Sequence, residues 1–254
     1  MINAERHPNA RVVASIEARM GSSRLPGKVL ADICGQPALS RLLERLRQCR
    51  RLDDVVLATS TAGEDDALEA WAAAHELAVY RGSEDDVLSR VVEAQQAMSA
   101  EIVVEITGDC PLLDPDIIDL GIESFFANET DVVNNFQTPS YAQGIDVQVF
   151  RLADLTEVER TVDDPAVREH VSLYFYEHPE RYRILTLLAP PCYREPELRC
   201  QLDYPEDWRF ITEVYRRLEP DHGGVFRFDK LQALLRREPE LREINRHCEE
   251  AAVR

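Results

Sequence analysis

The chain lacks any hydrophobic run that approaches the length of about 18 residues needed to cross a bilayer. Residues 1–10 are polar and contain no hydrophobic region of a signal peptide. The 6 cysteines form no C-x-x-C pair, which excludes a zinc ribbon and a thioredoxin motif. We therefore expect a cytoplasmic protein with reduced thiols, although the short separation of Cys192 and Cys200 leaves a bridge between them as an alternative.

Basic residues are also few. The 254 residues include 29 Lys and Arg against 47 Asp and Glu, which gives a formal net charge of −18. A field of this sign repels nucleic-acid phosphates and anionic membrane surfaces, so we expect neither as a partner. The remaining composition, with 44% hydrophobic residues, 14 Pro and 10 Gly, excludes collagen-like and wholly disordered chains. The length suits a single domain over residues 1–254.

The first half of the chain alternates short apolar runs with helical patterns. Each of the four runs is followed by a helical segment, and the first of these segments carries Leu39, Leu42, Leu43 and Leu46 on one face. The fourth begins at Asp114-Pro115, a cap followed by proline. Four strand-and-helix units predict an α/β fold in which helices flank a mostly parallel sheet. The predicted strands are 12–17, 55–59, 77–80 and 102–106.

The pattern changes after about residue 130, which indicates a C-terminal elaboration of the same domain. Pro220 is expected to prevent the helix that begins at Pro205 from continuing much beyond residue 217. No change of composition marks a domain boundary. The predicted strands are 131–135, 145–150 and 184–188, and the predicted helices are 151–161, 205–217, 228–237 and 239–252.

The loop after the first strand, residues 18–28, is unusual for an acidic protein. It holds Arg19, Arg24 and Lys28 together with two glycines and two serines. Glycine lets backbone amides approach an anion closely, and serine, arginine and lysine donate to phosphate oxygens. Its spacing matches neither the Walker nor the G-x-G-x-x-G pattern. The loop is therefore either a polyphosphate cradle of another kind or a solvated basic loop.

Two carboxylates follow predicted structural breaks. Gly108 ends the fourth strand and leaves Asp109 at its carboxyl end, where a ligand of Mg²⁺ is expected in an open α/β sheet. Asp203 precedes the helix that begins at Pro205, whose first turn already contains the acids Glu206 and Asp207. Either aspartate could instead be a plain turn residue.

Four segments carry a resemblance that covers nearly the whole chain. They are 18–30, 81–88, 107–112 and 203–207. In this order and spacing they resemble the cytidylyltransferases of the spore-coat polysaccharide type, relatives of the CMP-ketodeoxyoctonate and CMP-nonulosonate synthetases. The resemblance implies a GT-A-like Rossmannoid nucleotidyltransferase fold, CTP and Mg²⁺ as reagents, a CMP-sugar and pyrophosphate as products, and a homodimer. It also implies a role in the biosynthesis of surface polysaccharide or glycoconjugate.

The resemblance also implies roles for individual residues. Arg19, Lys28 and Asp109 correspond to catalytic residues, and Asp109 and Asp203 to metal ligands. Residues 11–130 would bind the nucleotide, while 131–254 would bind the acceptor and form the dimer. The implied nucleotide-binding residues are Ala18, Arg19, Met20, Gly21, Ser22, Ser23, Arg24, Lys28, Arg81, Ser83 and Asp109. The implied acceptor-binding residues are Gln143, Asp146, Arg168, Glu169 and His170.

Several of these positions have alternative interpretations. His170 is also typical of a buried histidine on a helix face, and the acids after Ser83 are typical of a helix N-terminus. The sequence departs from the family pattern at Gln148, where an acid is common, and at Cys200-Gln201, where Trp and Thr are frequent. These departures leave the acceptor open between a sugar acid, a sugar phosphate and a related small molecule.

The hypothesis is nucleotidyl transfer, in which an acceptor oxygen attacks the α-phosphorus of CTP. Such a reaction depends on positioning and on charge neutralisation, which Mg²⁺, Lys and Arg supply. One rival is a GT-A-type glycosyltransferase that consumes a nucleotide sugar, since that fold serves both reactions. Three cations in one loop favour a free triphosphate over a diphosphate. The other rival is a nucleotide-binding subunit without activity.

Overall fold

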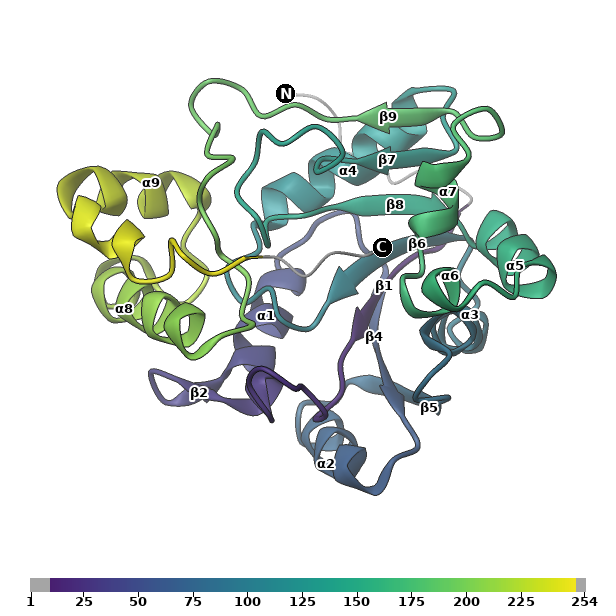
Figure 1. Cartoon of the computed structure of the whole chain (residues 1–254), viewed down its shortest axis with the longest axis horizontal. Coiled ribbons are helices and arrows are strands. Elements are labelled where there is room, and N and C mark those ends of the chain that lie inside the picture. Colours follow the sequence, from purple (N-terminus) through teal and green to yellow (C-terminus); the bar gives the residue numbers. More distant parts are fainter. Residues whose placement is uncertain (1–9, 250–254) are drawn as a thin grey trace.

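The computed structural model describes residues 10–249, in which one seven-stranded sheet has the order β5-β4-β1-β6-β8-β7-β9 (Figure 1). The four strands predicted in the first half of the chain are parallel, as expected. β1 (Val12–Glu17) lies between β4 (Asp54–Ser60) and β6 (Ile102–Thr107), and β5 (Ala78–Gly82) forms one edge. The apolar runs of β1, β4 and β6 are buried on both faces, which is typical of parallel strands between helices, whereas the edge strand β5 is half-buried.

Helices follow the four parallel strands. Two of them begin at side-chain caps, because Asp86 accepts a hydrogen bond from Ser89 N at 2.9 Å and Asp114 accepts one from Asp116 N at 3.0 Å. The helices are α1 (Ala38–Leu46), α2 (Asp66–Ala74), α3 (Val87–Ala97) and α4 (Pro115–Ala127). The sequence analysis did not anticipate the short elements η1 (Lys28–Leu30), β2 (Asp32–Ile33), β3 (Gln36–Pro37) and η2 (Gly63–Asp65).

The second half of the chain extends the same sheet. β8 (Gln148–Arg151) is antiparallel to β6 and to β7 (Val132–Asn134), while β9 (Ile184–Thr186) is parallel to β7 and forms the other edge. The register places Gln148 opposite Glu105 of β6. The sheet is therefore mostly parallel, with one antiparallel strand at the junction between the two halves.

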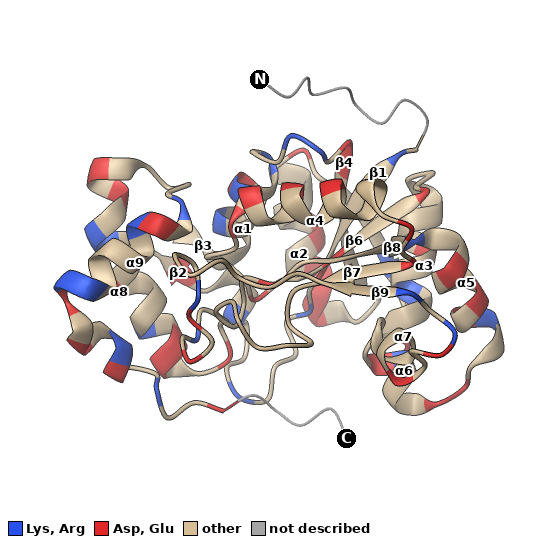
Figure 2. Ribbon diagram, turned by 90° about the horizontal axis from the view of Figure 1, so that it is seen from above, with Lys and Arg blue, Asp and Glu red and all other residues tan. Residues whose placement is uncertain are grey.

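Two hydrophobic clusters cover the two faces of the sheet. One face packs against α3, α5 (Leu152–Thr161) and the short helices α6 (Pro165–Glu169) and α7 (Leu173–Glu177). The other packs against α1, α2, α4 and the C-terminal helices α8 (Pro205–His222) and α9 (Phe228–Arg237). Figures 1 and 2 show α8 and α9 side by side at the end of the molecule opposite α5, α6 and α7.

The structure corrects two predicted helix ends. α8 continues through Pro220, which lies in its last turn, where the loss of one hydrogen bond interrupts little. The helix ends at Gly223, whose φ is 74°. The segment expected as a helix over 239–252 is a 3₁₀-helix, η3 (Pro239–Glu243), followed by turns, and residues 250–252 lie outside the described residues. Tertiary contacts override the helical pattern there, because the buried Asn245 amide donates to Arg199 O and Asp207 Oδ1.

Two further predictions in the second half of the chain are wrong. The strand expected at 145–150 begins only at Gln148, because the Asn135 side chain donates to Ile145 O at 2.8 Å and accepts from Val147 N at 2.9 Å. These bonds replace the pairing that a strand would need. His170 does not lie on a helix face but in the junction between α6 and α7, which the sequence analysis did not anticipate. All 6 cysteines are free, as predicted.

No helix among residues 10–249 is long and apolar enough to span a membrane.

Candidate active site

Four charged side chains converge beyond the carboxyl ends of β1 and β6. The Lys28 ammonium lies 2.7 Å from Asp109 Oδ2 and 2.7 Å from Asp203 Oδ1. Arg24 Nη2 reaches the same oxygen of Asp203 at 2.9 Å. The structure therefore brings together the basic loop and both carboxylates that the sequence analysis singled out, although they lie far apart along the chain.

Hydrogen bonds at the base of the loop 18–28 fix its conformation. Met20 N donates to Asp65 Oδ1 at 2.7 Å, and Gly27 N donates to Met20 O at 3.0 Å. Asp65 is buried, and its other oxygen accepts from Ser60 N at 3.2 Å. Gly27 has a φ of 70° and directly precedes η1, which begins with Lys28. These hydrogen bonds connect the loop to the end of β4 and fix the backbone turn that precedes Lys28.

Gly108 lets β1 and β6 end side by side. A Cβ at this position would lie 2.9 Å from Ala18 Cβ and 3.0 Å from Glu17 O. Gly108 N donates to Glu17 O at 2.8 Å, and Leu202 N donates to Asp109 O at 2.8 Å. Asp109 is therefore fixed beyond the end of β6 as predicted, and the segment before α8 is held against it.

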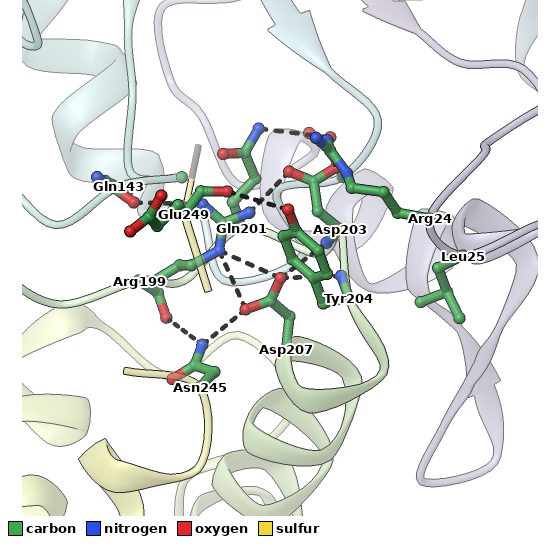
Figure 3. A network of polar contacts seen from close by, with 12 residues as sticks. Arg24, Leu25, Gln143, Arg199, Gln201, Asp203, Tyr204, Asp207, Asn245 and Glu249 are labelled. Atoms are coloured by element: carbon green, nitrogen blue, oxygen red, sulfur yellow. Dashed lines mark hydrogen bonds and ion pairs between the residues drawn. The ribbon is translucent and has the colours of Figure 1, made fainter. Parts of the chain in front are cut away.

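A buried network at the start of α8 holds Asp203 in place (Figure 3). Arg199 Nη2 lies 2.7 Å from Asp203 Oδ2, and Arg199 Nε lies 3.1 Å from Asp207 Oδ1. Asp207 also accepts from the backbone amides of Asp203 and Tyr204, at 3.0 Å each. Asp207 thus satisfies the helix start, as expected of an acid in the first turn, while it orients Arg199 toward Asp203.

Charge pairing outweighs burial within this cluster. Burial by itself lowers the pKa of Lys28, but the adjacent Asp109 and Asp203 raise that pKa above its ordinary value. Burial likewise raises the pKa of Asp203, but Lys28 and Arg24 bring it below its ordinary value. Both groups are therefore charged at neutral pH.

The cluster forms one wall of a cavity of about 530 Å³, a volume typical of small-molecule sites. The other walls come from residues 135–148 and from the junction between α6 and α7. Gly144, whose φ is 82°, allows the first of these segments to approach the backbone of Gln201, because a Cβ would lie 2.7 Å from Gln201 N. The cavity thus draws on both halves of the chain.

Four of the five residues predicted on the acceptor side line this cavity, namely Gln143, Asp146, Glu169 and His170. Gln143 Oε1 accepts from Arg199 Nη1 at 3.3 Å, which connects it to the network at the start of α8. Their presence in one cavity with Lys28 is consistent with an acceptor bound beside the charged cluster.

Arg168, the fifth, does not line the cavity. Its Nη1 lies 3.1 Å from Asp86 Oδ2 and 3.3 Å from Glu159 Oε1. Since Asp86 caps α3 and Glu159 belongs to α5, Arg168 fastens α6 to both helices.

Of the residues predicted to bind the nucleotide, Arg24, Lys28 and Asp109 line the cavity. Arg19 and Ser23 are exposed, Met20, Gly21 and Ser22 are half-buried, and Ala18 is buried, all outside the cavity lining.

The predicted pair Arg81 and Ser83 makes local contacts. Arg81 Nη1 lies 2.7 Å from Asp66 Oδ1, and its guanidinium donates to the carbonyl oxygens of Ser60 and Ala62. Ser83 Oγ accepts from Asp86 N at 3.0 Å, close to the start of α3. Neither side chain lines the cavity.

The sequence analysis missed two acids that line the cavity, Glu17 of β1 and Glu105 of β6. Both belong to strands that are otherwise apolar, and this was the available signal, because a buried strand rarely contains an acid without a reason. It also missed Arg199, whose partners lie four and eight residues further along the chain. Ion pairs between side chains of an irregular segment and the following helix produce no periodic pattern in the sequence.

The arrangement is suited to chemistry on phosphates. Carboxylate oxygens of two aspartates, together with Lys28 and Arg24, line an edge of the sheet where open α/β sheets bind nucleotides. Such a constellation stabilises charge that develops on phosphoryl oxygens, and no serine or cysteine nucleophile is needed.

Comparisons with known proteins show the family of the chain. Residues 13–238 match the family described as Cytidylyltransferase. The chain is 35% identical over 231 residues to the spore coat polysaccharide biosynthesis protein SpsF of Bacillus subtilis, which covers 89% of this chain and 94% of SpsF. It is 33% identical over 183 residues to a 3-deoxy-manno-octulosonate cytidylyltransferase of Chlorobium chlorochromatii, over 70% of this chain and 68% of that protein.

A solved structure supports the same assignment. A cytidylyltransferase of Leptospira borgpetersenii superposes with a TM-score of 0.87 at 27% identity, over 96% of this chain and 100% of that chain. The α/β nucleotidyltransferase fold and the family resemblance inferred from the sequence are thus confirmed. The chain belongs to the cytidylyltransferase family and is a nucleotidyltransferase.

Proposed function

We propose that this protein transfers CMP from CTP to a small acceptor, with Mg²⁺ as cofactor and release of pyrophosphate. The observation that carries the proposal is the convergence of Lys28, Arg24 and two aspartates at one edge of the cavity. The names of its relatives point to polysaccharide biosynthesis and to a sugar acid as acceptor. We place the protein in the biosynthesis of surface polysaccharide or glycoconjugate.

Asp109 and Asp203 would hold the Mg²⁺. Their carboxylates converge on a single cation, the Lys28 ammonium, and hard carboxylate oxygens are the ligands that Mg²⁺ prefers. The donor set therefore fits the metal. When bound, Mg²⁺ neutralises charge on phosphate oxygens.

The basic loop would bind the triphosphate. Lys28 and Arg24 contribute from the cavity wall, and Arg19 and the backbone of residues 21–23 contribute from the exposed rim. In the transfer, an acceptor oxygen bonds to the α-phosphorus, the bond from that phosphorus to the bridging oxygen breaks, and pyrophosphate leaves. A hydroxyl acceptor releases its proton to water, whereas a phosphate acceptor releases none. The cations lower the barrier by positioning the phosphates and by neutralising charge.

We assign nucleotide binding to residues 11–130, with Arg81 and Ser83 beside the nucleotide, and acceptor binding to residues 131–254. Gln143, Asp146, Glu169 and His170 would contact the acceptor directly, while Arg168 would act by holding α6 in place. The second half would also form a homodimer. This last assignment rests on the family resemblance.

A pyrophosphate assay tests the proposal. The purified protein is incubated with each nucleoside triphosphate, MgCl₂ and a panel of sugar acids, sugar phosphates and amino sugars. We expect release that requires CTP, MgCl₂ and an acceptor. We also expect Asp109→Ala to lower the rate about a hundredfold, the usual effect of losing one preorganised charge contact. Asp229→Asn, a change of an exposed acid on α9, is the matched control.

Two results would contradict the proposal. Near-normal pyrophosphate release by Asp109→Ala in excess MgCl₂ would refute the metal assignment. Transfer from a supplied nucleotide sugar, without pyrophosphate release from CTP, would identify a glycosyltransferase instead.

A further inference from the structure

Three side chains that can bind a metal ion lie together at the start of α8. Glu206 belongs to the first turn of that helix, while His247 and Cys248 follow η3. A carboxylate oxygen of Glu206, a ring nitrogen of His247 and the Cys248 Sγ all lie within 4.8 Å of one another. None of these three residues lines the cavity. The group is therefore separate from Asp109 and Asp203, the proposed ligands of Mg²⁺.

A turn brings the two neighbouring residues of this group to the same side of the chain. In an extended segment, the side chains of His247 and Cys248 would point in opposite directions. Residues 244–247 instead form a turn, and Cys248 N donates to Asn245 O at 3.0 Å. Both side chains therefore lie close to the Glu206 carboxylate, although the segments that carry them are far apart in the sequence.

Buried hydrogen bonds hold this turn against the helix. The Asn245 amide donates to Asp207 Oδ1 at 2.8 Å and to Arg199 O at 3.1 Å (Figure 3). Asn245 and Asp207 are buried, and Asp207 directly follows Glu206 in α8. The protein itself thus fixes the two segments relative to each other, which lowers the entropy cost of binding an ion between them.

The donor set is typical of a zinc site. Thiolate and imidazole ligands favour Zn²⁺, whereas Mg²⁺ prefers oxygen ligands. Zinc is commonly four-coordinate, and three protein ligands with one water complete that number. Bonds to zinc are about 2.0 to 2.3 Å long, so the donor atoms of a tetrahedral site lie about 3.3 to 3.8 Å apart. Small rotations of the three side chains are therefore enough to bring their donor atoms to one ion.

The surroundings of the Cys248 thiol favour a cation. Burial raises the pKa of this thiol, and the nearby Asp207 and Glu206 raise it further. Arg199 and Arg209 lower it in part. Arg209 Nη2 lies 3.1 Å from Glu206 Oε1, but its side chain is exposed and can turn to solvent. A bound divalent cation adds positive charge among these acids and deprotonates a coordinating thiol.

We propose that Glu206, His247 and Cys248 bind one Zn²⁺, with water as the fourth ligand. The ion joins the C-terminal segment to the first turn of α8 and so holds Asn245 in its contact with Asp207. It thereby supports the buried network at the start of α8 from outside the cavity. Its role is structural, and the proposal does not depend on the proposed transfer reaction.

Cobalt is the probe for this site, because a bond between Co²⁺ and a thiolate gives a charge-transfer band in the near ultraviolet. The reduced, full-length protein is freed of metal with EDTA, transferred to buffer with excess MgCl₂, and titrated with CoCl₂ and then with ZnCl₂. We expect one Co²⁺ per chain to produce the band and one Zn²⁺ to remove it. Cys248→Ser should abolish the band, whereas Cys192→Ser, which changes an exposed cysteine, should leave it unchanged.

Two further variants test the other ligands. Glu206→Gln and His247→Ala should each weaken the binding of Co²⁺ by about a hundredfold or more, because even a residue that only orients a metal ligand can contribute that much. His247 is exposed, so His247→Ala decides the question if Cys248→Ser does not fold. Asp229→Asn removes a charge from an exposed site on α9 and should leave the affinity unchanged.

Thermal unfolding measures the structural role. At a concentration about a hundredfold above its dissociation constant, ZnCl₂ should raise the Tm of the unmodified protein by about 5 °C or more. The Tm of Cys248→Ser and the Tm of His247→Ala should not respond to ZnCl₂.

The proposal is overturned if no thiolate band forms, if the band survives in Cys248→Ser, or if either Glu206→Gln or His247→Ala keeps the affinity of the unmodified protein. A rise in Tm with ZnCl₂ that persists in His247→Ala would place the ion elsewhere and would also overturn it. Pyrophosphate release from CTP is not used in any of these measurements, so a failure of the proposed function would leave their outcome unchanged.

Discussion

The two parts of the cavity differ in how their buried charges are satisfied. The cationic part contains Arg24 and Lys28 with Asp109 and Asp203, and Asp203 accepts from Lys28, Arg24 and Arg199. The acidic part contains Glu17, Glu105, Asp146 and Glu169, and burial raises the pKa of both Glu17 and Glu105. Ion pairs organise the first part before any ligand arrives, whereas burial in the second favours neutral carboxyl groups. Burial alone therefore does not define a site. Whether a buried ionisable group has an oppositely charged partner is equally important.

Removing Arg199 should produce the largest effect, since it makes the cationic part resemble the acidic one. Arg199→Leu would leave Asp203 and Asp207 buried without their shared cation. We expect the free energy of unfolding to fall by about 3 to 5 kcal/mol, as when one partner of a buried ion pair is lost. Urea unfolding measures it. Arg209→Leu, which changes an exposed arginine of α8, should change this free energy by less than about 0.5 kcal/mol, and equal effects of the two substitutions would contradict the comparison.

Lys28→Ala should have the next largest effect, on catalysis. It removes a cation from between Asp109 and Asp203, so we expect kcat to fall about a hundredfold and the KM for CTP to rise. Steady-state pyrophosphate release measures both. Lys230→Ala, which changes an exposed lysine of α9, is the control. Wild-type rates in Lys28→Ala would show that the convergence of charges has no catalytic role.

His170→Ala tests the acidic part. His170 lines the cavity beside Glu169, so its loss should raise the KM for the acceptor by about tenfold, the value of one hydrogen bond, and change the KM for CTP less. The acceptor used is the one that the pyrophosphate assay identifies. Equal changes in the two KM values would mean that His170 only supports the junction between α6 and α7.

The smallest effect concerns a carboxylate far from the cavity. Asp131 accepts from Arg183 and Arg151, and these arginines lower its pKa to about 2. Because the folded pKa lies below the unfolded value of about 4, the stabilisation is present above pH 4 and is lost as the pH falls toward 2.

Asp131→Asn should therefore lower the free energy of unfolding by about 1 kcal/mol at pH 7, a discounted value for a partly exposed pair. At pH 3 its effect should be smaller. Chemical unfolding at the two pH values measures this, and an effect that grows as the pH falls would contradict the assignment. Asp54→Asn, in an exposed pair with Arg11, should show little effect at either pH.

Much of the fold follows from local patterns. The four parallel strands, α3 and α4 were predicted because apolar runs, helical spacing and the caps at Asp86 and Asp114 agree with one another. The start of β8 was not predicted, because the Asn135 side chain forms hydrogen bonds with residues 145 and 147 that no local sequence pattern encodes. Pro220 gave a misleading signal, since its cost depends on how near the helix end it lies.

The site was predictable to the extent that its residues share a short segment or follow a strand. The loop 18–28 and Asp109 were found in this way, and Asp203 was found because it lacked another explanation. Arg199 was not found, because its ion pairs form only where the segment before α8 folds back against the start of that helix. Glu17 and Glu105 were overlooked because each belongs to a strand that the apolar pattern already explained.

The bridge that Lys28 forms between Asp109 and Asp203 has a consequence for how ligands enter. Without ligands, the Lys28 ammonium already neutralises the repulsion between the two aspartates. If Asp109 and Asp203 hold Mg²⁺ as proposed, its arrival together with a triphosphate would be an exchange, in which Lys28 would move from the carboxylates to the phosphates. The binding of nucleotide and the binding of metal would then each favour the other.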